Sequence, residues 1–337
     1  MTKQTALPRI AVFALGGTIA ATSAPGADGG GVTPRLGAEE LVAAVPSLRG
    51  VAELEAIAFR QVSSGNLTIA DIVALAVEIT KRLDAGASGV VVTQGTDTIE
   101  ETAFALDLLV AGPQPVVVTG AMRNPTLAGA DGPANLLAAV QVAISPQARG
   151  LGTVAVLGDE IHAARFVRKT HTSSPATFRS VATGPLGWIV EARPRIAVRT
   201  PQLRTLTSHP GPGPAVALLT TSLGDDDRLI AQIDGLGYAG AVVEAFGGGH
   251  MPACTVPALD RLARRMPVVL ASRTGGGEIL RETYASPGSE RDLLSRGLIP
   301  AGFLDGLKAR ILLSLLLADG ADTEGVRAGF EAVNALW

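Results

Sequence analysis

Short runs of apolar, β-branched residues recur along the first half of the chain, separated by longer segments of helical periodicity. The runs are IAVFAL from residue 10, GVVVTQ from 89, PVVVTG from 115 and TVAVLG from 153. Between them, residues 69–83 and 100–110 have the apolar spacing of amphipathic helices. Continuously apolar strands that alternate with helices are typical of a parallel sheet covered on both faces. The pattern therefore predicts an α/β fold.

A proline-rich stretch divides this alternation into two series. Residues 195–214 show no sustained periodicity, which is typical of a connection between domains. The second series contains the strand-like runs AVALLTT, GAVVEAF and PVVLAS, followed by the helical ARILLSLLLADG. We expect a larger N-terminal domain over residues 1–196, doubly wound with a mostly parallel sheet, a linker over 197–213 and a smaller C-terminal α/β domain over 214–337. The glycine-rich residues 24–31 are predicted to form a mobile loop.

The composition narrows the class of partner. Of the 337 residues, 47% are hydrophobic and 18% are charged, and the formal net charge is −3. Such a chain can form a large core, and it has no general attraction to nucleic acid or to an anionic membrane. No segment approaches the ~18 consecutive apolar residues of a membrane span. The expected partner is a small molecule or another protein.

The N-terminus resembles a secretion signal in one respect, because Lys3 and Arg9 precede an apolar run and ATSA follows it. Gly16 and Gly17 end that run after a few residues, whereas the core of a signal peptide is a longer apolar helix. We therefore interpret the run as a first strand that ends in a glycine turn, and we expect a cytoplasmic protein.

The cysteine and histidine content and the absence of common catalytic motifs weigh against several classes of chemistry. Cys254 is the only cysteine, and the four histidines show no metal-ligand spacing. The chain lacks the G-x-S-x-G, G-x-x-x-x-G-K-[ST] and H-E-x-x-H motifs of serine hydrolases, P-loop NTPases and zincins. The glycines at 26–31 do not directly follow a strand and open a helix, as a dinucleotide site requires. These observations weigh against a metal site and against a dinucleotide site.

Small polar residues follow two of the predicted strands. The first strand leads into GGT at residues 16–18, and the strand from residue 89 leads into GTDT at 95–98. Open parallel sheets bind ligands beyond the carboxyl ends of their strands, where glycine allows a tight turn and helix N-termini favour anions. Ordinary helix capping is the alternative, because Thr and Asp are common N-cap residues. The presence of two such ends favours a binding site.

Lys169 is the candidate base for hydroxyl chemistry. A threonine becomes a good nucleophile when another group takes its proton, and a lysine held neutral can do so. Lysine occurs four times, against 28 − 4 = 24 arginines, and arginine cannot accept a proton. Lys169 lies in a Ser/Thr-rich segment after the run from residue 153. A solvated surface lysine is the alternative interpretation.

Five motifs, in this order and spacing, resemble the bacterial L-asparaginase/glutaminase family. They are ALGGTIA (14–20), TQGTDTIEETAFALDL (93–108), PVVVTGAMRNPTLAGADGPANL (115–136), RKTHTSSPATF (168–178) and GLKARILL (306–313). The resemblance covers nearly the whole chain. It implies an amidohydrolase that converts L-asparagine and water into L-aspartate and ammonia without a cofactor. A glutaminase-asparaginase of mixed specificity and a non-catalytic amino-acid-binding protein are the alternatives.

The resemblance also implies roles for individual residues. Thr18 matches the family's nucleophilic threonine, and Thr96 matches its second catalytic threonine. Asp97 matches the aspartate that binds the substrate's α-amino group, and Lys169 matches the lysine that completes the set. Ser64 matches the serine that helps to hold the α-carboxylate. We expect Thr18 to attack the amide carbon, backbone N–H groups to hold the oxyanion, and water to resolve the acyl-enzyme.

The chain departs from the family pattern at several positions. Gly65, in the substrate-binding loop, stands where many secreted relatives have glutamine, and residues 22–37 lack the tyrosine of the family's lid. Gly248 and His250 stand where secreted relatives have asparagines. Tyr284 stands where the family has a substrate-binding glutamate. The acidic residues near it are Glu278, Glu282 and Glu290.

These departures remove contacts that the family makes with its substrate. A missing hydrogen bond in a closed site costs about 1–3 kcal/mol, so we expect a weaker KM than in secreted relatives. The family resemblance further implies a homotetramer of close dimers. In that assembly each site lies between the N-terminal domain of one chain and the C-terminal domain of its partner.

Overall fold

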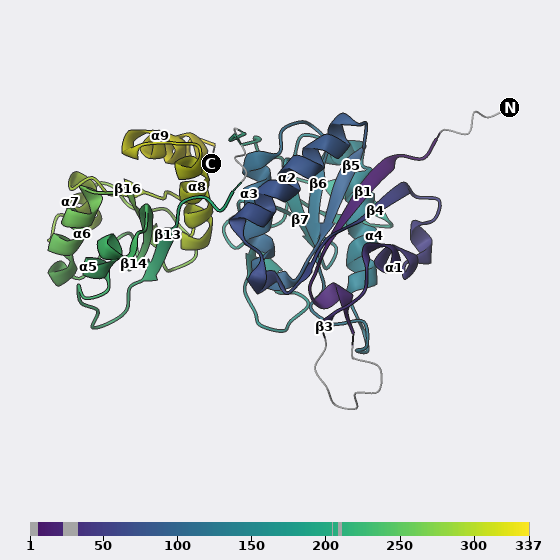
Figure 1. Cartoon of the computed structure of the whole chain (residues 1–337), viewed down its shortest axis with the longest axis horizontal. Coiled ribbons are helices and arrows are strands. Elements are labelled where there is room, and N and C mark those ends of the chain that lie inside the picture. Colours follow the sequence, from purple (N-terminus) through teal and green to yellow (C-terminus); the bar gives the residue numbers. More distant parts are fainter. Residues whose placement is uncertain (1–5, 23–32, 204, 208–210, 337) are drawn as a thin grey trace. The chain divides into compact units, whose positions relative to one another are not determined.

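The computed structural model describes residues 6–22, 33–203, 205–207 and 211–336. The chain forms two compact units that divide between Thr205 and Leu206 (Figure 1). This division lies within residues 197–213, the segment expected to link two domains. The glycine-rich residues 24–31, expected to form a mobile loop, lie outside the described residues.

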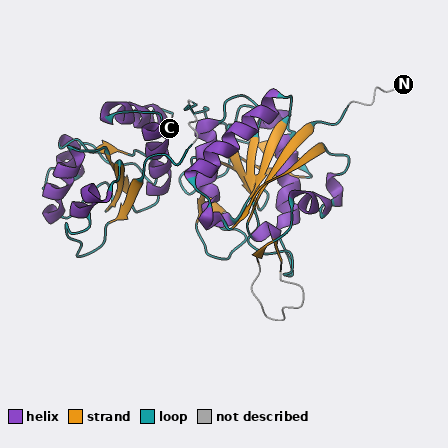
Figure 2. Ribbon diagram, viewed as in Figure 1, coloured by secondary structure: helices purple, strands orange, loops and turns teal. Residues whose placement is uncertain are grey.

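The described part of the N-terminal unit is built on one large sheet, which Figure 2 shows in orange with purple helices beside it. The sheet has eight strands in the order β12-β11-β8-β7-β6-β5-β1-β4. The parallel strands are β4 (Glu53–Val62), β1 (Arg9–Gly16), β5 (Gly89–Thr93), β6 (Val116–Thr119) and β7 (Thr153–Leu157). The antiparallel strands are β8 (Glu160–Ala163), β11 (Gly187–Val190) and β12 (Arg193–Ile196). The four apolar runs form β1, β5, β6 and β7, so the predicted mostly parallel sheet is confirmed.

Helices cover both faces of this sheet, because its central strands are apolar on both sides. Helix α3 (Ile99–Leu109) packs on β6 and β7 beside α2 (Ile69–Asp84). Helix α4 (Gly132–Ala143) packs on β5, β6 and β7, and α1 (Ala38–Ala43) packs on β4. Val91 and Val117 contribute to the core under α4, whereas their buried neighbours along each strand point to the other face. The predicted helices at 69–83 and 100–110 are confirmed as α2 and α3.

The strand order reverses at β1. The carboxyl ends of the strands on either side of this point are a natural binding site. The chain passes from β1 to β4 on one side and then returns to β5 on the other side of β1. The parallel register pairs Ala14 of β1 with Thr93 of β5, so the turns that follow these two strands begin side by side at the carboxyl ends of the strands. Open α/β sheets bind ligands in the crevice at such a switch point.

The C-terminal unit contains a smaller parallel sheet, as predicted. Its strands, in both chain and spatial order, are β13 (Val216–Thr220), β14 (Gly240–Ala245), β15 (Val268–Ser272) and β16 (Ile299–Pro300). Its helices are α5 (Ile230–Ile233), α6 (Val256–Ala263), α7 (Glu290–Ser295), α8 (Gly306–Ala318) and α9 (Thr323–Asn334). The runs AVALLTT, GAVVEAF and PVVLAS form β13, β14 and β15.

Two short antiparallel pairs complete the N-terminal unit. They are β2 (Ala21–Thr22) with β3 (Thr33–Pro34), and β9 (Arg168–Lys169) with β10 (Phe178–Arg179). Within the described ranges of the chain, no helix has the length and apolar character needed to cross a membrane.

A buried ion pair joins α3 to the segment that follows β8. Asp107 Oδ2 lies 3.9 Å from the guanidinium of Arg165, and both side chains are almost fully buried. The backbone N–H of Thr153 donates to Asp107 Oδ1 over 2.8 Å, and Arg165 donates to the carbonyl of Pro201 over 2.5 Å. Burial raises the pKa of Asp107 to about 6 despite these partners, and burial lowers the pKa of Arg165. The attraction between the two groups therefore offsets only part of the cost of burying them.

Candidate active site

The turns after β1 and β5 lie against each other, backbone to backbone. Gly16 and Gly17 have φ angles of 97° and 82°, which turn the chain sharply at the end of β1. A Cβ atom on Gly17 would lie 2.0 Å from the backbone nitrogen of Gly95, so a larger residue does not fit there. Thr18 and Thr96, which follow these two contacting glycines, therefore lie at the same edge of the sheet.

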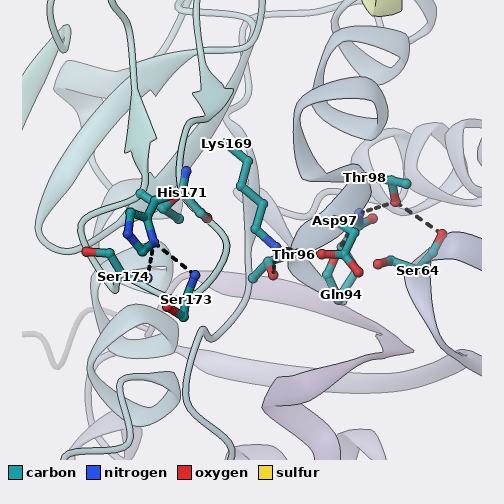
Figure 3. Close-up of polar contacts among 11 residues, drawn as sticks. Ser64, Gln94, Thr96, Asp97, Thr98, Lys169, His171, Ser173 and Ser174 are labelled. Atoms are coloured by element: carbon teal, nitrogen blue, oxygen red, sulfur yellow. Dashed lines mark hydrogen bonds and ion pairs between the residues drawn. The ribbon is translucent and has the colours of Figure 1, made fainter.

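Lys169 contacts Thr96 and Asp97 in the second turn. Its Nζ donates to Thr96 Oγ1 over 2.9 Å and lies 2.5 Å from Asp97 Oδ1 (Figure 3). Thr96 is 5% exposed and the Lys169 side chain is 14% exposed, whereas 71% of the Asp97 side chain is exposed. Thr96 and Asp97 lie in a 3₁₀ turn, Thr96–Thr98, that leads into α3. One ammonium group thus joins a buried hydroxyl to an exposed carboxylate.

This arrangement can exchange a proton and bind an amine. Because Lys169 donates to Thr96 Oγ1, that oxygen uses a lone pair for the bond, and its own proton can point towards another acceptor. A lysine that has lost a proton can accept the proton of a neighbouring hydroxyl. The exposed carboxylate of Asp97 can pair with a cationic ligand. Within the described residues, no group of three or more His, Cys, Asp or Glu side chains could hold a metal ion.

Ser64 and Gly65 bring a third segment to the same place. Ser64 is buried in the 3₁₀ turn Ser64–Asn66 after β4, and Thr98 Oγ1 donates to its carbonyl oxygen over 3.2 Å (Figure 3). A Cβ atom on Gly95 would lie 2.7 Å from Ser64 Oγ, so the serine hydroxyl lies directly against the turn that precedes Thr96. Gly65 is exposed, and a Cβ atom there would meet nothing within 4 Å.

Gln94 supports these turns, although the sequence analysis did not single it out. It is fully buried, and its Nε2 donates to Thr98 Oγ1 over 3.2 Å and to the carbonyl of Gly95 over 3.3 Å. These contacts fix both ends of the turn that carries Thr96. The signal in the sequence is an amide side chain at the end of an otherwise apolar strand.

Asn135 and Asp131 support the adjoining turn after β6, and both were also missed. Asp131 accepts hydrogen bonds from the backbone N–H groups of residues 122 and 123 over 3.0 and 2.8 Å. Asn135 donates to the carbonyl of Gly120 over 2.9 Å and accepts from the N–H of Gly158 over 3.0 Å. The carboxyl ends of β6 and β7 are therefore tied together. A buried asparagine in the apolar helix α4 was the available signal.

In the C-terminal unit, Glu290 is buried and holds its own turn. Its Oε1 accepts from the backbone N–H groups of residues 283 and 284 over 2.8 and 2.6 Å. Burial raises the pKa of Glu290, but these hydrogen bonds outweigh it and hold the pKa below its usual range. The ring of Tyr284 packs edge-on against His250 at a centroid distance of 4.8 Å. Glu290 is thus engaged within its own unit, whereas Glu278 and Glu282 are exposed.

The fold and the site define a two-domain α/β protein in which two threonine-bearing turns meet at a switch point, with a lysine bonded to one of them. Residues 9–202 match the family described as "Asparaginase, N-terminal", and residues 215–330 match the "Glutaminase/Asparaginase C-terminal domain". The chain belongs to the asparaginase family. It is therefore related to hydrolases that act on amide bonds.

Relatives match along both units of the chain. "Probable L-asparaginase" from Deinococcus radiodurans is 40% identical over 332 residues, which cover 96% of this chain and 97% of that protein. "L-asparaginase 2" from Bacillus subtilis is 34% identical and covers 96% of this chain and 89% of its own length. "Probable L-asparaginase periplasmic" from Haemophilus influenzae is 32% identical, with 96% and 93% covered.

Proposed function

We propose that this protein is an L-asparaginase that hydrolyses L-asparagine to L-aspartate and ammonia. The observation that carries the proposal is the contact of Lys169 with Thr96 and Asp97, beside the turn of Thr18, at the switch point of the sheet. The family and the names of the relatives support the same activity. The proposal requires no metal and no organic cofactor.

The substrate is an amino acid, and its two fixed charges define how it binds. The exposed carboxylate of Asp97 pairs with the α-ammonium group. Ser64 and the backbone N–H groups of the adjoining glycine turns hold the α-carboxylate. Gly65 leaves open space beside this loop, since no atom lies within 4 Å of a Cβ position there. With both ends held, the side-chain carboxamide is directed towards Thr18.

Hydrolysis then proceeds through an acyl-enzyme. Thr18 Oγ1 bonds to the carboxamide carbon, and its proton passes to the pair formed by Thr96 and Lys169. Backbone N–H groups of the glycine turns hold the tetrahedral oxyanion. When the C–N bond breaks, the same pair returns a proton to the nitrogen, and ammonia leaves. Water then attacks the ester, which releases L-aspartate and restores the hydroxyl of Thr18.

A steady-state assay of ammonia release from L-asparagine, D-asparagine and L-glutamine tests this function. Thr18→Ala and Thr96→Val should each lower kcat by at least about 10³-fold while the far-UV circular dichroism stays unchanged. Thr183→Val, at an exposed threonine of the same unit, is the matched control and should keep wild-type turnover. Near-normal activity of the Thr18 or Thr96 variant would refute its assigned role.

The same assay separates the two alternatives. One methylene changes a binding free energy by only ~1–3 kcal/mol, so similar kcat/KM values for asparagine and glutamine would define an enzyme of mixed specificity. Thermal stabilisation by asparagine without ammonia release would instead define an amino-acid-binding protein. A micromolar KM for asparagine would contradict the weaker binding expected from the missing family contacts.

The assembly and location are further parts of this proposal. We propose a homotetramer of close dimers in which the segment around Tyr284 reaches a neighbouring chain's site. Light scattering gives the oligomeric state, and Tyr284→Ala should raise KM more than it lowers kcat.

We also propose a cytoplasmic location. Cell fractionation tests it directly, and recovery of the protein from the periplasm would refute it.

A further inference from the structure

The turn between β9 and β10 begins at the residue after Lys169. Lys169 is the last residue of β9, and its backbone is paired with Phe178 of β10, which is buried. Residues 170–177 connect these two strands. The position of the Lys169 ammonium therefore depends on how firmly this turn holds the two-residue strand on which the lysine lies.

His171 closes this turn with its side chain. Its Nδ1 lies 3.1 Å from the backbone nitrogen of Ser173 and 3.0 Å from that of Ser174, and both N–H groups donate to it (Figure 3). An imidazole nitrogen that accepts hydrogen bonds carries a lone pair, so the proton of the neutral ring is on Nε2. One side-chain atom therefore satisfies two backbone groups of the turn.

The backbone of His171 is fixed by a second set of bonds. Its N–H donates to Thr177 Oγ1 over 2.6 Å, and the same hydroxyl donates to the His171 carbonyl over 2.7 Å. The N–H and the hydroxyl of Thr170 both donate to the Thr177 carbonyl, over 2.9 and 2.8 Å. His171 thus connects the tip of the turn to its base, directly beside Lys169.

We propose that His171 is a positioning residue for Lys169. The acceptor at Nδ1 holds the turn 170–177 closed, and the closed turn keeps β9 in register with β10. That register holds Nζ within hydrogen-bond distance of Thr96. The expected effect on turnover rests on the proposed function. The effect on the position of Lys169 does not, and it can be tested without any substrate.

Three variants isolate the acceptor. His171→Ala removes Nδ1. His171→Asn keeps an acceptor, since its Oδ1 is bonded to Cγ as Nδ1 is. Ser174→Ala is the matched control, because it removes the bond from the Ala176 N–H to Ser174 Oγ in the same turn and leaves Nδ1 untouched.

The first measurement is the labelling rate of Lys169 by an amine-reactive ester, followed by mass spectrometry of peptides. Lys81, with a side chain 60% exposed, is the internal reference, against 14% for Lys169. Loss of a lone pair that two N–H groups share raises the population of an open turn by about 5- to 10-fold. His171→Ala should therefore raise the Lys169 rate relative to Lys81 by at least about fivefold. His171→Asn and Ser174→Ala should stay within about twofold of wild type.

The second measurement is turnover of L-asparagine. A displaced Lys169 should lower kcat about tenfold in His171→Ala with KM changed by less than about twofold, because the proposed substrate-binding side chains of Asp97 and Ser64 are both still present. His171→Asn should recover the wild-type kcat. A purely structural role would lower the melting temperature of His171→Ala without moving the labelling rate or kcat.

The outcomes separate the two proposals. An unchanged Lys169 labelling rate in His171→Ala overturns the positioning role, as does a His171→Asn variant that behaves like His171→Ala. A wild-type protein without asparaginase activity overturns the proposed function, and the labelling test still decides the role of His171. Should His171→Ala fail to fold, His171→Gln replaces it, because glutamine carries its acceptor one bond further from the backbone.

Discussion

Arg165→Met should destabilise the protein, and the double variant Asp107→Asn/Arg165→Met should recover much of the loss. The rise in the pKa of Asp107 from 3.8 to about 6 corresponds to about 3 kcal/mol for ionising this buried carboxyl group. Without Arg165 the carboxylate loses the cation that offsets its burial, and we expect a loss of about 3–5 kcal/mol at pH 8. The double variant contains neither charge and keeps an amide oxygen for the N–H of Thr153. It should exceed Arg165→Met by about 2 kcal/mol or more.

The pH dependence gives the sharper test. A carboxyl group with a raised folded pKa stabilises the fold in its protonated form, so its contribution is complete below pH 3.8 and is lost as the pH rises through about 6. Arg165→Met should therefore be closer to wild type at pH 5 than at pH 8 in urea unfolding. Lys81→Met, at an exposed ion pair with Glu78, is the control and should unfold at nearly the same urea concentration as wild type at both pH values. Equal destabilisation of Arg165→Met at both pH values would refute the reasoning.

Three further predictions test the site and the core. Lys169→Arg should keep the charge and lower kcat by about 10²-fold or more, because a guanidinium cannot give up its proton; wild-type ammonia release would contradict this. Gly17→Ala should lower both the melting temperature and turnover, since its Cβ would meet backbone at 2.0 Å, whereas Gly65→Ala, with open space around it, should melt within about 2 °C of wild type; equal melting temperatures of the two variants would count against the contact between the turns. Burial lowers the pKa of His162 below 6.5, so stability that depends on its neutral form is complete above pH 6.5 and is lost as the pH falls. His162→Gln should flatten the fall in melting temperature on acidification, and an unchanged slope would exclude this role.

The parallel half of the large sheet was predictable because each of its apolar runs is buried on both faces. Val90 to Val92 and Val116 to Val118 are all almost fully buried, so local composition alone indicates these strands. The antiparallel strands gave no such signal. β12 contains Pro194 between two exposed arginines, and it forms a strand because it pairs with β11 at the edge of the sheet. A four-residue segment that forms a strand through long-range pairing has no detectable hydrophobic periodicity, so the sequence alone did not predict it.

The candidate site was predictable to a similar extent. Thr18, Thr96 and Asp97 stand out because polar residues follow apolar strands, and Lys169 stands out in a chain that uses arginine for most of its positive charge. The contact between Lys169 and Thr96 spans 73 positions of sequence, so spacing alone could not show it. The hydrogen bonds of His171 are local, but sequence could not show which ring nitrogen accepts or what the turn holds in place.

The placement of β1 between β4 and β5 sets an order on folding during synthesis. β1 can pair with β4 once residue 62 has left the ribosome, but its other side stays unpaired until Gly89–Thr93 has emerged. An unpaired strand of apolar residues is a template for association with other chains. Nascent fragments that end before β5 should therefore associate with other chains more readily than fragments that contain β5, in which β1 is paired on both sides.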